Sequence, residues 1–184
     1  MFLNCCRLGG TLELGTRKRP GSVVLTANNI FSNAGIEEAV IGRGVSSLPK
    51  QFFMWDKSFP SSRLRSVVLD SVDSFGEKVF AGCKAVEDVW FKGPAPTTYG
   101  ANVFQGWAAG QSILHLPKFQ PTWTDWAEAN VTLWDDLTDD QRDLYRDRFP
   151  GRKAYGMTTS SATPASQFVV WWDAEAQPTV LIVK

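Results

Sequence analysis

Residues 80–91 read Phe-Ala-Gly-Cys-Lys-Ala-Val-Glu-Asp-Val-Trp-Phe. An aromatic residue opens this stretch, small and polar residues follow, and Val86, Val89 and Phe91 then stand at L-x-x-L-x-L spacing. Alternation along an extended chain points Val89 and Phe91 to the same side. The stretch therefore predicts a short strand with one buried side, preceded by an apolar anchor at a corner of the chain.

The same pattern recurs upstream at a regular interval. The other copies use Leu64, Val67 and Leu69; Phe31, Ile36, Ala39 and Ile41; and, more loosely, Phe2, Cys5, Leu8, Leu12 and Leu14. The last anchors are Leu14, Ile41, Leu69 and Phe91, and the strand expected at residues 113–116 ends the series at intervals of 27, 28, 22 and 25. Leucine-rich repeats have periods of roughly 20 to 29 residues. The sequence thus predicts such a repeat.

A repeat solenoid over residues 1–128 is the fold that this period favours. We expect four to five turns, each with one short parallel strand and an irregular return, and aromatic residues stacked between neighbouring turns. The first copy starts within a repeat, which predicts a solenoid truncated at its N-terminus. A small sandwich or barrel is the alternative, although sandwich strands usually recur at shorter spacing.

Residues 129–184 no longer follow the repeat. Thr138 to Gln141 reads as a capping box that opens an amphipathic helix, which Pro150 and Gly151 end. Apolar runs at residues 168–172 and 179–183 predict a β-hairpin. Two interpretations stay open, a small α+β cap on the solenoid or the start of a second domain.

Composition argues against several classes of function. Lys and Arg number 19 against 19 for Asp and Glu, so no excess of positive charge would attract nucleic acid. No apolar run approaches the roughly 20 residues of a membrane helix. Cys5, Cys6 and Cys83 match neither a paired disulfide framework nor zinc-ligand spacing, and we interpret them as small apolar residues. Spacing alone does not decide whether Cys5 and Cys83 meet.

Catalytic and metal sites have little support in the sequence. The lone histidine, His115, is expected to face away from the core, exposed or in a surface hydrogen bond. Acidic residues at 135, 136, 139 and 140 suit the start of a helix, and Asp70 and Asp73 lack the spacing of a calcium loop. We predict neither an enzyme nor a cofactor or metal.

The strand-lined face is the candidate binding surface. Trp90 lies between inward-pointing Val89 and Phe91, so alternation directs it outward. The residues predicted to contact a ligand are Trp90, Arg65, Val68, Glu38 and Val40. Such a face suits a peptide, or a sugar ring by stacking. Packing of Trp90 on the loop that carries Trp55 or Trp107 is the alternative.

The segment from Phe80 to Pro96, and then Phe104, residues 113–117 and Trp123 to Trp126, resembles the BspA-like group of bacterial leucine-rich repeats. The resemblance covers about residues 1–128, although the usual repeat asparagine is missing after Leu69 and Phe91. It implies adhesion by a cell-surface or secreted protein, with a protein or glycan on a host or neighbouring cell as the partner. A spacer within a larger surface protein, without a ligand of its own, is the alternative function.

Overall fold

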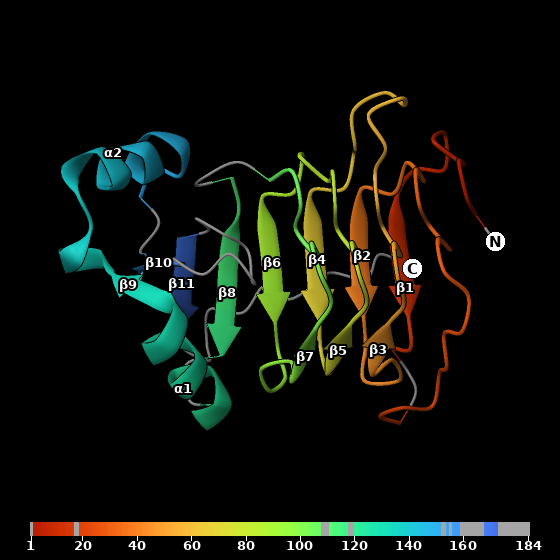
Figure 1. The fold of residues 1–184 in the computed structure, drawn as a ribbon, viewed down its shortest axis with the longest axis horizontal. Coiled ribbons are helices and arrows are strands. Elements are labelled where there is room, and N and C mark those ends of the chain that lie inside the picture. The colour runs from red at the N-terminus through yellow and green to blue at the C-terminus, as the bar shows by residue number, and fades with distance from the viewer. Residues whose placement is uncertain are drawn as a thin grey trace.

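The computed structural model describes residues 2–16, 19–107, 111–117, 120–151, 154, 156–158 and 168–172. Within them, parallel strands stack as a solenoid of about four turns (Figure 1). One strand per turn contributes to a long sheet, and these strands are β1 (Thr11–Leu14), β2 (Glu38–Ile41), β4 (Ser66–Leu69), β6 (Asp88–Phe91) and β8 (Ile113–Pro117). Each predicted repeat copy ends in one of these strands, which confirms a repeat solenoid.

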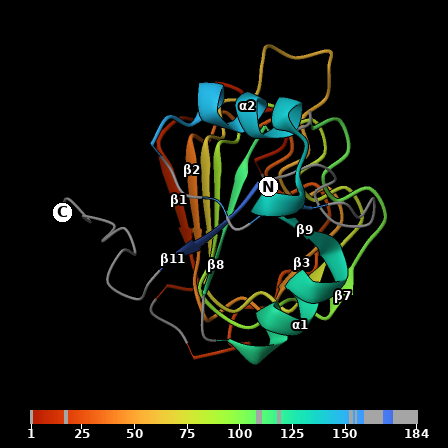
Figure 2. The ribbon, with the colours of Figure 1, turned by 90° about the vertical axis from the view of Figure 1, so that its left-hand side faces the viewer.

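The return path of each turn is more regular than expected. Three returns carry short strands, β3 (Ser47–Leu48), β5 (Ser74–Phe75) and β7 (Thr98–Tyr99), which pair in parallel as a second sheet. Seen along the coil, the two sheets form opposite walls (Figure 2). The expectation of wholly irregular returns is therefore wrong. Stacking explains the pairing, because consecutive returns of similar length place their backbones side by side.

A ladder of phenylalanine rings runs through the corner before the long-sheet strands. Ring centroids are 5.3 Å apart for Phe2 and Phe31, 6.1 Å for Phe31 and Phe53, and 5.6 Å for both Phe53–Phe80 and Phe80–Phe104. All four pairs are stacked, as predicted for aromatic residues of neighbouring turns, although Phe53 was not among the aromatics assigned to a copy. The rings line up because the backbone N–H groups of one turn donate to carbonyls of the next, for example Phe53 to Val79 at 2.8 Å.

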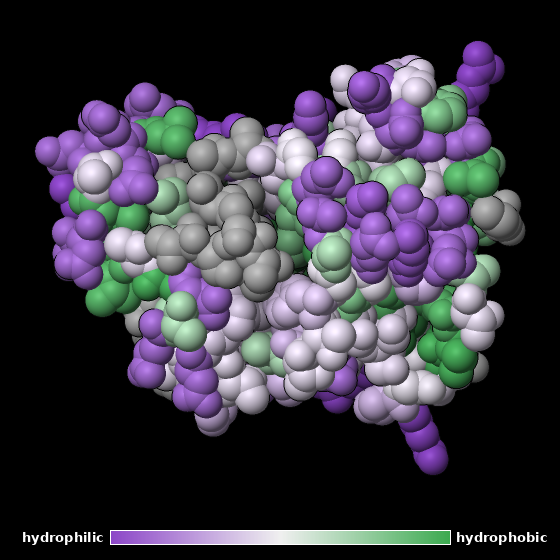
Figure 3. Space-filling model, in the orientation of Figure 1, coloured by the Kyte–Doolittle hydropathy of each residue, from purple (hydrophilic) through white to green (hydrophobic). Residues whose placement is uncertain are grey.

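A loop projects from the turn between β2 and β4. Phe53 is part of the ladder, and the backbone N–H of Trp55 still donates to the Ala81 carbonyl, so the turn is regular up to Trp55. Residues 56–63 are then additional chain before the anchor Leu64. This loop forms the largely hydrophilic projection at the upper right of Figure 3. The connection between β2 and β4 is therefore a regular turn followed by an insertion.

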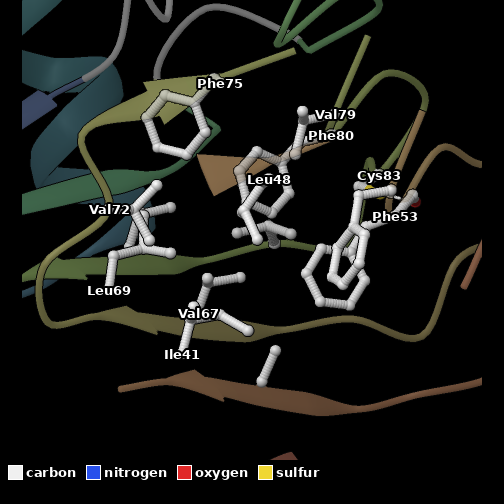
Figure 4. Close-up of a cluster of buried hydrophobic side chains, with 14 of the residues drawn as sticks. Ile41, Leu48, Phe53, Val67, Leu69, Val72, Phe75, Val79, Phe80 and Cys83 are labelled. Atoms are coloured by element: carbon white, nitrogen blue, oxygen red, sulfur yellow. Dashed lines mark hydrogen bonds between the residues drawn. The ribbon is translucent and has the colours of Figure 1, made fainter. Parts of the chain in front are cut away.

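Side chains from both sheets fill the interior of the coil. Ile41, Val67 and Leu69 point inward from the long sheet and meet Leu48 and Phe75 from the short one (Figure 4). All five are at most 1% exposed. Alternation on the strands therefore leaves every second residue of the long sheet on its other side.

The C-terminal segment lies at the β8 end of the coil (Figures 1 and 2). Its elements are α1 (Pro121–Asn130), β9 (Val131–Leu133), a 3-10 turn (Trp134–Asp136), α2 (Asp139–Arg148), β10 (Gly156–Thr158) and β11 (Phe168–Trp172). Helix α2 begins with the predicted capping box, in which Thr138 and Gln141 bond reciprocally. Helix α1 was not expected, although Pro121 in its first turn is a recognised start signal.

Strand β11 confirms one run of the predicted hairpin but has other partners. It pairs in parallel with β8 and antiparallel with β10, and β10 pairs with β9, so the long sheet continues into the C-terminal segment. The second run, residues 179–183, lies outside the described residues. Trp123 of α1 seals the coil interior, with its ring centroid 4.7 Å from that of Phe91 and its Nε1 donating to the Gly93 carbonyl at 2.9 Å.

Candidate functional site

The outward side of the long sheet, called the outer face below, carries two rows of side chains in register. One row runs Glu13, Val40, Val68, Trp90 and His115. The second runs Thr11, Glu38, Ser66, Asp88 and Ile113. Neighbouring strands lie about 4.8 Å apart, so each row is a nearly continuous strip. Pairing without offsets thus brings residues from five strands onto one side of the sheet, where Val68, Ile113 and His115 are buried.

Three of the five predicted site residues are consecutive in one row. Val40, Val68 and Trp90 come from β2, β4 and β6, and Glu38 lies in the adjacent row, where its carboxylate accepts a hydrogen bond from Thr11 at 3.0 Å. Arg65 is exposed but precedes β4 at the corner of the turn. Arg65 directly precedes Ser66, which faces outward, so Arg65 is out of register with the outward-facing residues. The structure therefore groups four of the predicted residues and places Arg65 apart from them.

A shallow hollow of about 180 Å³ opens on the outer face beside Val40 and Val68. Its other lining residues are Glu13, Thr16, Gly42, Asp70 and Lys92. A Cβ added at Gly42 would lie 2.5 Å from the Thr16 Cα, so only glycine allows the two backbones to approach this closely. The hollow therefore has an apolar floor and a rim that carries charges of both signs.

Trp90 stacks on a histidine rather than on a distant loop. The Trp90 and His115 ring centroids are 3.4 Å apart and their planes differ by 6°. Trp107 instead packs against Phe104 and donates to the Phe80 carbonyl, and Trp55 lies in the core of the coil. Among the described residues, the stacking partner of Trp90 is therefore His115 rather than Trp55 or Trp107, and Trp90 lies on the outward side of the strand as alternation predicts.

His115 is buried, which corrects the expectation of an exposed ring. It faces away from the coil interior, but only 1% of it is exposed. Trp90 covers one face of the ring, and on the same side of β8 Ile113 packs with Leu137, Tyr145 and Phe149. His115 Nε2 lies 2.6 Å from an Asp88 carboxylate oxygen, which as an acceptor orients the imidazole. A substrate has no access to this ring in the observed arrangement.

Three of the acidic groups considered as metal ligands have side-chain partners within the protein. Asp139 pairs with Arg142 at 2.8 Å, and this hydrogen bond lowers the pKa of the Asp139 carboxyl. Asp70 pairs with Arg43, and Asp73 accepts from the Thr97 hydroxyl at 3.0 Å. Among the described residues, no three His, Cys, Asp or Glu side chains gather where they could hold a metal ion.

The cysteines form no disulfide. Cys5 is exposed, Cys6 is half-buried and Cys83 is buried, and all three thiols are free. Cys83 Sγ donates to the Phe53 carbonyl at 3.0 Å, and burial raises the pKa of this thiol to about 12. Cys83 therefore serves as a small core residue, as the sequence analysis proposed.

Searches against protein-family models, curated proteins and solved structures find no match to this chain. In the described residues, no helix is both long and apolar enough to cross a membrane. Because no known protein matches, the candidate binding site on the outer face is defined by the geometry of this chain alone. The sequence analysis missed the contribution of Glu13, Asp70 and Lys92. Alternation contains the signal for Asp70 and Lys92, which lie two positions after Val68 and Trp90, and the repeat interval contains it for Glu13, which is in register with Val40.

Proposed function

We propose that this protein is a non-catalytic binding module that contacts a protein or a glycan through its outer face. The observation that carries the proposal is the strip formed by Val40, Val68 and Trp90 with the hollow beside it. An apolar floor supplies contact area, and charged groups at the rim supply orientation. Such a surface suits an extended peptide or a short run of sugar rings.

The cellular setting of this function is part of the proposal. The segment from Phe80 to Pro96 supports a BspA-like leucine-rich repeat, and with it adhesion to a host or neighbouring cell by a bacterial surface or secreted protein. The formal net charge of zero supports a partner other than nucleic acid. No cofactor has a role in this function.

A spacer within a larger surface protein is the second candidate function. Ion pairs between consecutive turns favour it, namely Arg43 with Asp70, Lys50 with Glu77, and Arg63 with Glu37. These pairs use exposed charges to connect neighbouring turns. A surface whose charges pair with one another has fewer groups left to bind a ligand.

A binding array separates the two candidates. The purified protein is screened against glycans and extracellular-matrix proteins, together with Val40→Glu, Trp90→Ala and Arg65→Ala. The control is Val24→Glu, because Val24 is 78% exposed and lies on none of the long-sheet strands. We expect a hit that Val40→Glu weakens by at least about tenfold, because a buried carboxylate opposes an apolar contact.

Each outcome of the array has a distinct meaning. A hit that survives in both Val40→Glu and Trp90→Ala places binding away from the outer face and refutes the proposed site. Loss in Arg65→Ala alone moves the site to the corner of the turn. No hit from a folded sample, checked by circular dichroism, supports the spacer.

A further inference from the structure

A second hollow lies between the inserted loop and the next turn, and none of its lining residues belongs to the outer-face rows. Its volume is about 420 Å³, within the range of small-ligand sites. The residues that matter for its chemistry are Trp55, Lys57, Phe59, Ser61, Ser62 and Lys84. We call this cavity the Trp55 hollow. It is independent of the proposed function, because it shares no residue with the outer face.

The shape of the Trp55 hollow depends on a close contact between two turns. Gly82 has φ +76°, and a Cβ there would lie 2.0 Å from the Trp55 carbonyl oxygen. Glycine thus lets the turn of residues 82–85 pass directly against Trp55. On the opposite side, the loop is held by Asp56, whose carboxylate accepts from the Ser58 N–H at 2.8 Å and whose own N–H donates to Asn33 at 2.7 Å. Both walls are therefore fixed by the protein itself.

A buried polar donor at the hollow lacks a partner. Trp55 is 8% exposed and Ser62 is 7% exposed. Within the described residues, Trp55 Nε1 makes no hydrogen bond, whereas the Ser62 hydroxyl lies beside the Cys83 thiol and interacts with it through a side-chain hydrogen bond. Buried donors normally find an acceptor, because leaving one unpaired costs stability. A bound ligand would supply that acceptor.

The charge at the hollow is positive. Lys57 and Lys84 are exposed at its edge and form no ion pair within the described part of the chain, whereas Lys50 and Lys78 both pair with Glu77. The neighbouring carboxylate of Asp56 is already bonded to Ser58, and these bonds lower its pKa. Two ammonium groups therefore remain for an anionic ligand.

We propose that the Trp55 hollow binds an acidic sugar, a ring that carries a carboxylate and hydroxyl groups. The carboxylate lies between Lys57 and Lys84, and the apolar side of the ring packs on Phe59 and Trp55. Ring hydroxyls accept from Trp55 Nε1 after a small shift of the indole and exchange hydrogen bonds with Ser61 and Ser62. Neither lysine nor the serines stood out in the sequence, because the inserted loop and the turn of residues 82–85 meet only in the fold.

Titration with digalacturonic acid tests the proposal, with its dimethyl ester as the uncharged comparison. Binding is followed by ligand-observed NMR on the full chain. We expect saturable binding of the acid that weakens with added salt, and about fivefold to tenfold weaker binding of the ester. Lys57→Gln and Lys84→Gln should each weaken binding of the acid by a similar factor. Lys50→Gln, which changes an exposed lysine that lines neither hollow and pairs with Glu77, should leave it unchanged.

The alternatives give different results. Equal binding of acid and ester overturns the assigned charge chemistry, and unchanged binding in both lysine variants overturns the assigned site. Absence of binding at about 10 mM sugar overturns the proposal as a whole. Because Lys57 and Lys84 are exposed, their variants are expected to fold, and circular dichroism verifies this. Loss of the array hit in Val40→Glu without loss of digalacturonate binding shows that the two sites are separate.

Discussion

At the scale of single residues, four successive turns share a left-handed backbone position before the phenylalanine ladder. Asn29, Gln51, Lys78 and Asn102 have φ between 57° and 58° and stand two residues before the ladder phenylalanines. Asparagine tolerates this conformation, whereas glutamine and lysine adopt it at a cost of about 1 kcal/mol. The turns that contain Gln51 and Lys78 therefore have backbone strain that an asparagine at the same position would reduce.

Lys78→Asn should stabilise the protein. Asparagine adopts positive φ more readily than lysine, so we expect the free energy of unfolding to rise by roughly 0.5 kcal/mol, even after loss of the exposed pair with Glu77. Urea denaturation measures the change. Lys92→Asn serves as the control, because Lys92 is not among the positive-φ residues. An equal rise in both variants would show that backbone strain is not the cause.

Cys83 should resist alkylation in the folded protein. Burial raises the pKa of its thiol from 9.0 to about 12, so at pH 8 only about one molecule in ten thousand has the reactive thiolate. Raising the pH toward 12 increases that fraction. Peptide mass spectrometry after iodoacetamide treatment should find Cys5 modified and Cys83 intact, and both modified in urea. Similar rates for the two cysteines in the native protein would contradict the buried position of Cys83.

At the scale of elements, the phenylalanine ladder connects the corners of successive turns. Phe80 is fully buried between Phe53 and Phe104, whereas Phe2 at the first turn is 47% exposed. Removing a ring inside the ladder leaves a cavity and removes the stacking contacts with two neighbouring rings. Removing a ring at its end affects one contact, with Phe31.

Phe80→Ala should therefore destabilise the protein far more than Phe2→Ala. We expect a loss of about 3–5 kcal/mol for Phe80→Ala and about 1 kcal/mol for Phe2→Ala. Chemical denaturation of the two variants gives both values. Losses of equal size would show that the ladder does not extend to Phe2 in solution.

At the scale of the whole molecule, stability is expected to be a sum over turns and their interfaces. Strand β6 is paired on both sides, by β4 and β8, and lies in the middle of the coil. Strand β1 has one partner, β2, among the described strands. Hydrophobic surface also gathers at the end of the coil where the chain begins, the right-hand end of Figure 3. That end has fewer stabilising contacts than the middle.

Hydrogen exchange should reveal this gradient. Amides of β6 should be the slowest to exchange and those of β1 the fastest among the long-sheet strands, since opening one edge strand breaks a single interface. Exchange followed by peptide mass spectrometry resolves the strands individually. Uniform protection from β1 to β6 would indicate that the turns unfold together rather than in sequence.

The sequence by itself determined the turns of the solenoid. Period and alternation identified the five long-sheet strands and the outward position of Trp90, because these features depend only on residues close along the chain. The capping box of α2 is local in the same sense. Such signals are visible in one strand or one helix at a time.

Tertiary structure alone decided which distant residues meet. Burial of His115 depends on its neighbours in the long sheet, with Trp90 of β6 stacked on the ring and β11 paired with β8, and the pairing of β3, β5 and β7 depends on stacked returns. The Trp55 hollow forms where an inserted loop meets residues about 25 positions away. No local pattern encodes these contacts. The spacing of apolar residues shows only to which side of a strand or helix each side chain points. Whether that side chain is buried depends on which distant part of the chain packs against it.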